Sequence, residues 1–433
     1  MSDTQKCPAT AVDSGATPQG GERLPGGGER APERVVHAKG SAAHGFFETT
    51  EDVSQFTRAG LFQRGVKTPL FLRFSTEVGE QGSADTVRDP RGFAIKFYSE
   101  EGNYDLVGSN TPVFFIRDAS RFPDLIHSRG RQPDTGIRSN DMQWDFWTLS
   151  PESSHQVMIL MSDRGTPRTL RHMNGYGSHA FSWVNAGGER FWVKYHFKTL
   201  QGIENYTEAE ALQMAAEDPD AHRRDLRRAI DAGEAPEWRL EMQIMPFEEA
   251  ASYRFNPFDL TKVWPHSDYP AVDVGRLVLD RNPEHFAEVE QAGFSPANLV
   301  PGIGLSPDQM LIGRIFSYHD PHLQRIGAGY EQLPINSPKS SAGEEPISIA
   351  DLSWSEEAAE IERWASARHA EDDDFGQPGS LYREVMDDAQ RDELVANIVR
   401  HASDDVSPEV QDRVVSYWTQ VDSVLGSRVA SRL

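Results

Sequence analysis

The sequence predicts an α+β protein built around a closed antiparallel β-sheet, followed by a long irregular segment and by helices at the C-terminal end. Three observations support this prediction. Short apolar or β-rich runs, each bounded by turn residues, recur between residues 68 and 245. Two stretches with helical spacing interrupt these runs before the last one. Residues 352–430 return to helical periodicity after a stretch rich in Pro and Asn.

Seven or eight short strands are expected, because turn residues separate the runs. The runs are Thr68–Ser75, Gly92–Tyr98, Pro112–Ile116, Gln156–Met161, Phe181–Val184, Phe191–Phe197 and Trp238–Met245. The turn Asn185-Ala186-Gly187-Gly188 predicts a hairpin between two of them. Closing such a sheet into a barrel would remove its exposed edges.

The predicted helices lie in two parts of the chain. Thr207–Glu217 opens with a capping pattern and Pro219–Ala232 follows it, so both are expected to form a helical insertion between the last two strands. Apolar residues recur at helical spacing near the C-terminal end, at Leu394, Val395, Ile398 and Val399. The irregular stretch between these parts is long, and such segments usually wrap another element or have a function.

These patterns divide the chain into four predicted parts. They are a disordered arm over residues 1–30, a β-barrel domain with its helical insertion over 31–246, a wrapping segment over 247–351 and a C-terminal helical domain over 352–433. The arm is rich in small residues and has almost no large apolar ones, which is typical of disorder.

Composition excludes several classes of function. No run of about 18 apolar residues occurs, which argues against a membrane span. The formal net charge of −24 argues against nucleic acid as a partner, because phosphate binding needs concentrated Lys and Arg. The one cysteine, Cys7, allows no internal disulfide, and no signal peptide is evident. A reducing, cytoplasmic location is therefore expected.

Two segments contain the residues with the clearest chemical potential. In the first, His37 lies in the apolar context of RVVHAKG, where a structural role and an acid–base role are both open. In the second, Arg314 precedes Tyr318 by four residues, so both side chains share one helix face and the cation favours the phenolate. A tyrosinate suits ferric iron as a ligand. The alternatives are an ordinary buried tyrosine and a zinc pair at His319 and His322, for which no further ligand stands at plausible spacing.

Several longer motifs resemble those of the monofunctional haem catalases of the small-subunit type. They are Glu33–Gly40, Arg73–Thr76, Ser83–Gly92, Asp105–Asp118, Arg171–His179, Phe255–His266 and Arg314–Arg325. The resemblance runs from about Ala31 to Pro338 and continues more weakly at Phe375–Arg383. It implies an eight-stranded antiparallel β-barrel with a helical insertion, a wrapping segment and a C-terminal helical domain. It also implies the disproportionation of hydrogen peroxide to water and dioxygen through a ferryl intermediate, as a protection against oxidative stress.

The resemblance assigns catalytic and cofactor roles by motif. His37 is the expected distal acid–base, Ser75 its hydrogen-bond partner and Tyr318 the proximal iron ligand, the tyrosine ligation known for catalases. His179 and Asp308 are expected to extend a polar relay behind Tyr318. The expected contacts of haem b are Arg34, Val36, Arg73, Phe114, Phe122, Arg314, Tyr318, His322 and Arg325. Among these, the expected propionate partners are Arg34, Arg73 and Arg325. The planar guanidinium of arginine binds a carboxylate in bidentate fashion.

Many members of the family also bind NADPH. The matching positions are His155, Ser162, Arg164, Asn174, Tyr176, Lys198, Val263, Trp264 and His266. No glycine fingerprint of a dinucleotide site is present, so the occupancy by NADPH stays open. The family further implies a homo-oligomer, either a tetramer or, if the short stretch Asn336–Leu352 weakens assembly, a dimer.

The distal motif departs from the family pattern. The family's distal asparagine is the first Asn of Gly-Asn-Asn-Thr-Pro, but here Ser109 holds that position and Asn110 follows. We expect Ser109 at the site with weaker orientation of the peroxide, and a shift of Asn110 into the role is the alternative. Glu77 replaces an apolar residue of the family's access channel, where a carboxylate is costly unless solvated or paired. Asp89 fits the family's channel carboxylate.

Two further functions stay open from the sequence. Ser109 and Glu77 are compatible with a catalase-like haem peroxidase, or a hydroperoxide-converting enzyme, of reduced catalatic activity. The non-enzymatic alternative is a haem-binding scaffold that has lost turnover. Retention of the residues assigned to chemistry argues against it, and these are His37, Ser75, Arg314 and Tyr318.

Overall fold

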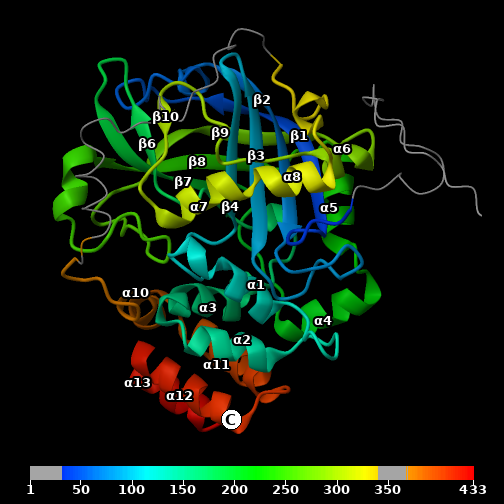
Figure 1. Cartoon of the computed structure of the whole chain (residues 1–433), viewed down its shortest axis with the longest axis vertical. Helices are drawn as coiled ribbons and strands as arrows, with labels where there is room; N and C mark the ends of the chain where they lie inside the picture. Colours follow the sequence, from blue (N-terminus) through cyan, green and yellow to red (C-terminus); the bar gives the residue numbers. More distant parts are fainter. Residues whose placement is uncertain (1–31, 340–366, 368) are drawn as a thin grey trace, which may run out of the picture.

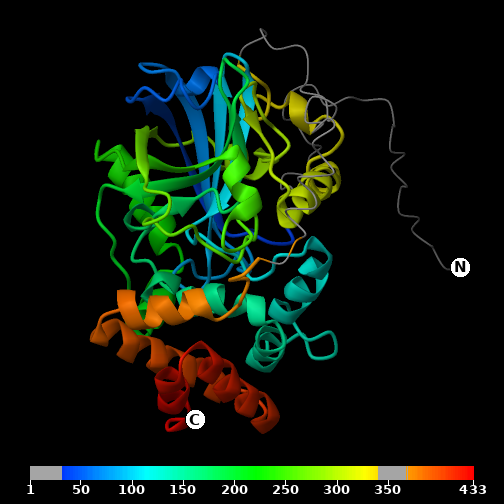
Figure 2. The ribbon, with the colours of Figure 1, turned by 90° about the vertical axis from the view of Figure 1, so that its left-hand side faces the viewer.

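The computed structural model describes residues 32–339, 367 and 369–433. A closed sheet forms one end of the molecule, and helices α1–α3 separate it from the C-terminal helices at the other end (Figures 1 and 2). The predicted disordered arm, Cys7 and most of the stretch Asn336–Leu352 lie outside the described residues. The division of the chain into four parts stays a prediction.

Within the described ranges, ten strands join one antiparallel sheet. They are β1 Gly40–Thr49, β2 Lys67–Thr76, β3 Arg91–Ser99, β4 Gly102–Ser109, β5 Gly175–Tyr176, β6 Phe181–Val184, β7 Arg190–Thr199, β8 Glu237–Pro246, β9 Val272–Arg281 and β10 Ile303–Gly304. β1 pairs with β2 and β9, and β7 pairs with β5 and β8, so the sheet closes on itself. Because β5 and β10 are only two residues long, eight longer strands remain, as the resemblance implies.

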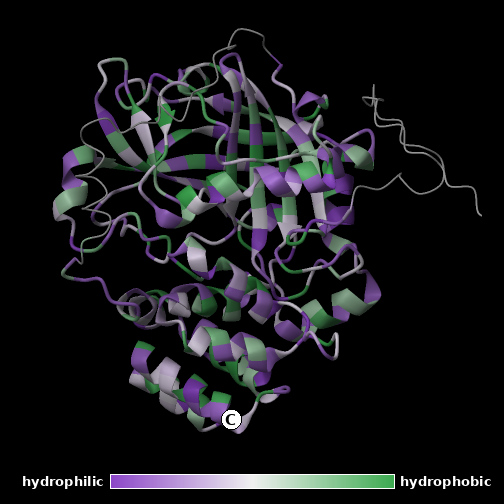
Figure 3. Cartoon of the chain, in the orientation of Figure 1, coloured by the Kyte–Doolittle hydropathy of each residue, from purple (hydrophilic) through white to green (hydrophobic). Residues whose placement is uncertain are grey.

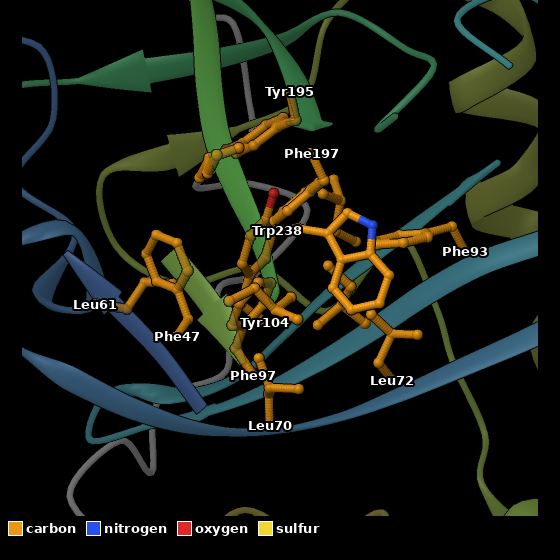
Figure 4. Close-up of a cluster of buried hydrophobic side chains, with 14 of the residues drawn as sticks. Phe47, Leu61, Leu70, Leu72, Phe93, Phe97, Tyr104, Tyr195, Phe197 and Trp238 are labelled. Carbon is orange, nitrogen blue, oxygen red and sulfur yellow. The ribbon is translucent and has the colours of Figure 1, made fainter. Parts of the chain in front are cut away.

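Aromatic and aliphatic side chains fill the interior of the barrel (Figure 4). Phe47 of β1, Tyr104 of β4 and Trp238 of β8 are fully buried, although they come from distant parts of the chain. The indole N–H of Trp238 donates to the carbonyl of Met173, 2.9 Å away, so its polar atom is satisfied. Apolar and polar residues alternate along several barrel strands (Figure 3), the pattern of a sheet with one face toward a core.

The described residues also form helices, which lie along the barrel or in a helical layer at one end of it (Figure 1). They are α1 Phe122–Arg129, α2 Asn140–Thr148, α3 Ser154–Met161, α4 Glu208–Glu217, α5 Ala221–Asp231, α6 Phe286–Gln291, α7 Gln309–Ser317, α8 His319–Arg325, α10 Gly376–Ser380, α11 Asp388–Ser403, α12 Pro408–Val421 and α13 Ser423–Ala430. The two predicted insertion helices are α4 and α5, and the predicted cap is present at Thr207, which forms a capping box with Glu210. None of the described helices has the length and hydrophobicity to cross a membrane.

Two predicted strands are wrong. Gln156–Met161 forms most of helix α3, all of whose residues are buried. A helix buried on every side has no polar face, so its short apolar run cannot be distinguished from a strand by periodicity. Pro112–Ile116 forms no regular element, although Phe115 and Ile116 are buried. Its apolar residues pack in the core of the helical layer instead of pairing in the sheet.

Strands β1, β4 and β9 were not expected. β1 and β9 are adjacent, and their backbones approach closely at Gly45 and Gly275. A Cβ atom at Gly45 would collide with the carbonyl of Val278, and one at Gly275 would collide with the carbonyl of Glu48. The close approach therefore requires glycine, which interrupts the alternation that identifies a strand. Because β9 is one of the barrel strands, part of the predicted wrapping segment belongs to the barrel itself.

Candidate active site

His37 lies on the segment that enters β1, and its backbone is held in the left-handed region with φ of +61°. This conformation is uncommon for a residue other than glycine, and it persists only where surrounding contacts enforce it. The amide of His37 donates to the carbonyl of Glu77 at 2.8 Å, and Arg73 Nη2 donates to the carbonyl of His37 at 2.9 Å. The backbone of His37 is therefore held in place at both its amide and its carbonyl.

The imidazole of His37 is half-buried and paired. Its Nδ1 lies 2.9 Å from Oγ of Ser75 on β2. A Cβ atom at Gly92, which pairs with Ser75 in the sheet, would collide with Ser75 Oγ and lie 3.0 Å from His37 Nδ1, so glycine leaves room for the ring. Burial, assisted by the cation of Arg73, lowers the pKa of His37 to about 4. The ring is therefore neutral near pH 7 and able to accept a proton.

Ser109 ends β4 directly opposite Gly92, so it shares the sheet face to which Ser75 belongs. Its hydroxyl donates to the carbonyl of Arg91 at 3.1 Å. The side chain of Asn110 is directed to β3, where its Oδ1 accepts from the amide of Arg91 at 2.7 Å. This contact favours Ser109 over Asn110 as the distal polar group.

Tyr318 follows helix α7, and one guanidinium group contacts its hydroxyl twice. Nε and Nη2 of Arg314 donate to Tyr318 Oη at 3.2 and 2.6 Å. Nη1 of Arg314 lies 2.7 Å from Nε2 of His179, and Nδ1 of His179 lies 2.6 Å from Oδ2 of Asp308. Oδ1 of Asp308 also caps α7 by accepting from the amides of Met310 and Leu311.

The hydrogen-bond partners of His179 determine its tautomer. A guanidinium N–H can only donate, so Nε2 of His179 accepts from Arg314 and Nδ1–H donates to Asp308. Burial lowers the pKa of His179, in agreement with a neutral ring. The relay therefore orients Arg314, and through it the phenol oxygen of Tyr318, with defined donors at every step.

Three arginines from different elements surround one acid. Arg34 Nη1 lies 3.2 Å from Glu290 Oε2, Arg73 Nη2 lies 4.0 Å from Glu290 Oε1, and Arg325 donates to the carbonyl of Glu290. Burial lowers the pKa of Arg325 to about 9, and the charge of Arg34 adds to the effect. One carboxylate cannot balance three guanidinium groups, which leaves two positive charges uncompensated.

The arginine cluster fits the two propionates of a haem. Arg73 Nε and Arg325 Nη2 are buried and have no hydrogen-bond partner among the described residues. Buried donors of this kind call for an acceptor, and two added carboxylates would supply both the acceptors and the missing charge. Glu290 was not predicted from the sequence, because a lone glutamate gives no local signal of partners so far along the chain.

The remaining haem-contact candidates are Val36, Phe114, Phe122 and His322. Val36 and Phe114 are half-buried, and Phe122 at the start of α1 is 37% exposed, so all three have apolar surface that a ligand face could cover. His322 of α8 has its ring centroid 6.3 Å from that of Tyr318, and its Nδ1 is buried without a partner among the described residues. Burial, with the charge of Arg325 adding to it, lowers the pKa of His322 to about 4.

The candidate NADPH residues form two groups. In the first, Lys198 Nζ lies 5.2 Å from the ring centroid of Tyr176, and Asn174 donates to the hydroxyl of Tyr176. Burial opposes ionisation of Tyr176, but the cations of Lys198 and Arg164 lower its pKa below the usual value. His266 is exposed, and its ring lies near that of His196, which in turn contacts Tyr176.

The second group is occupied by internal contacts. Trp264 is buried and donates to the carbonyl of Pro257, and Gln377 bonds both the amide and the carbonyl of Val263. His155 is buried in α3, and the hydroxyl of Ser162 donates to the carbonyl of Ile159. Trp264, His155 and Ser162 are buried, whereas Val263 is half-buried.

Glu77 is buried and paired. Its Oε2 lies 2.8 Å from Nη1 of Arg129, at the end of α1, and both side chains are almost inaccessible. Arg129 was not predicted as the partner of Glu77, because nothing local to α1 indicates a buried ion pair.

Comparisons with known proteins identify the family of this chain. The family model for catalase matches residues 27–350, and the model described as catalase-related immune-responsive matches residues 368–433. The chain is 52% identical to a catalase of Methanosarcina barkeri over 93% of this chain and 85% of the relative. It is 51% identical to a bromoperoxidase-catalase of Streptomyces venezuelae, over 92% of this chain and 89% of that protein.

Solved structures give the same result for the fold. A bacterial catalase superposes with a TM-score of 0.87 at 48% identity, covering 93% of this chain and 87% of that one. Catalase A of Saccharomyces cerevisiae superposes with a TM-score of 0.84 at 40% identity, covering 93% of this chain and 90% of that one. The barrel, the helical layer and the sequence all match, and the chain belongs to the catalase family.

Proposed function

We propose that this catalase disproportionates hydrogen peroxide, converting two molecules into two waters and one dioxygen. The observation that supports it best is the convergence of two polar groups on one site. The neutral His37 is paired with Ser75, and Tyr318 is held by the relay through Arg314. Arg73 donates to the carbonyl of His37 and lies 4.0 Å from Glu290, and Arg325 of the helix that follows Tyr318 donates to the carbonyl of Glu290, so the two groups border one site.

The family implies a haem cofactor, and we propose haem b. Tyr318 would hold the iron, and Arg34, Arg73 and Arg325 would hold the propionates. When bound, the haem supplies the redox chemistry of the reaction. Purified protein with b-type haem would give the pyridine haemochrome spectrum of protohaem, whereas a modified haem would give a shifted one.

His37 is proposed to move one proton between the two oxygens of peroxide. A Ser75 hydroxyl that accepts from Nδ1–H leaves the Nε2 lone pair free to take the proton from one oxygen. Delivery of that proton to the other oxygen makes water the leaving group, so that the O–O bond can break heterolytically. Overall, the second peroxide gives up two protons and two electrons and leaves as dioxygen, and these reduce the first peroxide to two waters.

An oxygen electrode tests the proposed function directly. Haem-loaded protein, with its occupancy measured by the Soret absorption, should release one dioxygen for every two peroxides consumed. Peroxide consumption without oxygen release, at full haem occupancy, would reject disproportionation.

Turnover is expected to stay constant over the neutral range and to fall as the pH drops through about 4. Burial holds the pKa of His37 near this value, and the imidazolium that forms below it has no lone pair to accept the peroxide proton. Initial rates between about pH 3.5 and 8, with the Soret band recorded after each assay, check this. A midpoint near the ordinary histidine value of about 6.5 would contradict it.

The same shift predicts how the stability of the fold varies with pH. Histidines of the unfolded chain, with pKa values near 6.5, bind protons before His37 of the folded protein does. The unfolded state is therefore favoured increasingly as the pH falls from about 6.5 to 4, and stability lost in this window should return when the pH is raised.

Ser109→Asn is expected to raise kcat/KM for hydrogen peroxide by up to about 100-fold, because one oriented polar group contributes about that much in a preorganised site. The longer amide would reach into the site from the position opposite Gly92. Oxygen release at several peroxide concentrations measures the change. Ser54→Asn, at an exposed serine, is the control. A large fall in kcat/KM of Ser109→Asn would mean that the site is built around serine.

A second candidate function is the oxidation of other substrates by peroxide. The observation that favours it is Ser109, whose hydroxyl is already bonded to the carbonyl of Arg91. The Streptomyces venezuelae relative is named a bromoperoxidase-catalase. Measuring the oxidation of phenolic donors and organic hydroperoxides beside oxygen release distinguishes the two functions. Rapid donor oxidation with little oxygen release would favour a peroxidase.

We propose three further properties, each with its own measurement. The cationic group around Tyr176 supports a bound NADPH, which would be detected by its fluorescence after the purified protein is denatured. Catalases are typically oligomeric, and we propose a homotetramer, with a dimer as the alternative, to be resolved by sedimentation equilibrium. The single cysteine supports a reducing compartment, and we propose the cytoplasm, to be tested by cell fractionation.

A further inference from the structure

Three charged side chains lie buried together beside the distal histidine. Glu77 follows β2, Asp89 precedes β3, and Arg129 ends α1. Arg129 Nη1 lies 2.8 Å from Glu77 Oε2, and Arg129 Nη2 lies 2.6 Å from Asp89 Oδ1. None of these side chains is more than 5% exposed. One guanidinium group is therefore the shared counter-charge of two carboxylates inside the protein.

The cluster is connected to His37 through the main chain. The second oxygen of Asp89 accepts from the amide of Glu77 at 2.6 Å and from the amide of Val78 at 2.9 Å. The carbonyl of the same Glu77 accepts from the amide of His37 at 2.8 Å. This bond is one of the two contacts that fix the left-handed backbone of His37, so its length depends on where Asp89 holds Glu77.

Removal of the guanidinium would leave two buried carboxylates beside each other. Burial raises the pKa of Asp89 even with Arg129 present, and Glu77 adds to the effect. The other cation that acts on Asp89 is Arg91, but its guanidinium is bonded to the main-chain carbonyls of Asp85, Val87 and Asp89. Repulsion between the two ionised acids would displace Asp89 from the Glu77 and Val78 amides.

We propose that Arg129 is a positioning residue for the proton transfer at His37, acting through Asp89 and the main chain of Glu77. The proposal rests on the proposed function, in which His37 moves the peroxide proton. Arg129 also accounts for the carboxylate at Glu77, because a buried acid needs such a partner. The guanidinium lies 4.8 Å above the ring centroid of Phe115, a contact that restricts it further.

The proposal also predicts how kcat/KM of an Arg129 variant depends on pH. His37 is affected by Arg73, Asp89, Arg314 and Arg34, and of these Asp89 is the group that forms an ion pair with Arg129. In Arg129→Gln, one of the two unpaired acids should keep its proton up to near-neutral pH, as buried carboxyls do. When this proton leaves, repulsion between the carboxylates begins, so kcat/KM should decline as the pH rises from about 5.5 to 8.

The test uses three haem-loaded variants and oxygen release. Arg129→Gln should lower kcat/KM at pH 7 by at least about tenfold, since small displacements of a catalytic group have effects of this size. The double variant Glu77→Gln/Arg129→Gln removes the repulsion. Its kcat/KM should recover to within about threefold of the wild type and should not decline between about pH 5.5 and 8. Arg131→Gln is the matched control, because Arg131 forms an exposed pair with Glu80. It should change kcat/KM by less than about twofold.

A crystal structure of haem-loaded Arg129→Gln gives a readout that does not depend on activity. The distance between the His37 amide and the Glu77 carbonyl should exceed about 3.5 Å, beyond a hydrogen bond, and should be restored in the double variant. An unchanged distance, full activity of Arg129→Gln, or a double variant as impaired as the single one would overturn the proposal. Absence of oxygen release from the wild type would instead reject the proposed function, and the crystallographic comparison would still decide the role of Arg129.

Discussion

His37→Ala is expected to retain haem and to lose about 100- to 10,000-fold in kcat, the contribution of a positioned acid–base group. The candidate haem ligands, namely Tyr318 and the arginines around Glu290, are not altered by the substitution. The side chain that accepts the peroxide proton, in contrast, is absent. The Soret absorption measures haem occupancy, and the oxygen electrode measures kcat on the same sample.

Two further variants separate the loss of the base from a change in the backbone. Alanine is strained at the left-handed φ of residue 37, whereas asparagine tolerates this conformation. His37→Asn should therefore fold like the wild type and still lack turnover. His127→Ala, at an exposed histidine of α1, should change kcat by less than about twofold. Near-normal oxygen release by His37→Asn would reject His37 as the acid–base.

Tyr318→Phe is expected to lower haem occupancy and to reduce oxygen release per protein at least about 100-fold, equivalent to ~2.7 kcal/mol of transition-state stabilisation. The substitution removes one oxygen atom, which is the proposed iron ligand and the acceptor of two hydrogen bonds from Arg314. Arg314 would then be left with unpaired donors beside an apolar ring, which adds a cost in stability.

The neighbouring Tyr330 provides the control for this prediction. Its hydroxyl also has a hydrogen-bond partner, His319 Nδ1 at 3.2 Å, and its ring packs against His322. Tyr330→Phe removes the same atom without removing the proposed ligand, so haem occupancy and the position of the Soret band should be preserved. A Tyr318→Phe protein with a wild-type spectrum and wild-type rate would exclude Tyr318 as the iron ligand.

Local patterns in the sequence predicted those parts of the fold that local interactions determine. The cap at Thr207 and the Asn185–Gly188 turn were predicted because their stabilising contacts lie within a few residues. Helix α3 was mistaken for a strand, because its surroundings come from distant helices and only the tertiary structure explains an apolar run without a polar face. Strand β9 was missed for a related reason, since glycine is required where it approaches β1.

The candidate site divides in the same way. His37, Ser75 and Tyr318 lie in motifs that resemble those of the family, and Arg314 is four residues from Tyr318. These residues could therefore be predicted from the sequence alone. Glu290 and Arg129 escaped prediction because each is defined by partners far away in the chain. The arginines bound to Glu290 are up to 256 residues distant, and no periodicity encodes an ion pair of that span.

Asp308 has a consequence for how this protein can change during evolution. One of its oxygens begins helix α7 and the other binds His179, so a single carboxylate serves both the folding of the helix and the orientation of the phenol at its end. Selection for a stable fold and selection for reactivity therefore act on the same side chain and cannot be satisfied by separate substitutions. Substitution of Asp308 is therefore constrained both by the stability of α7 and by the orientation of the phenol. A lineage that lost the activity would still be expected to keep a capping residue at this position.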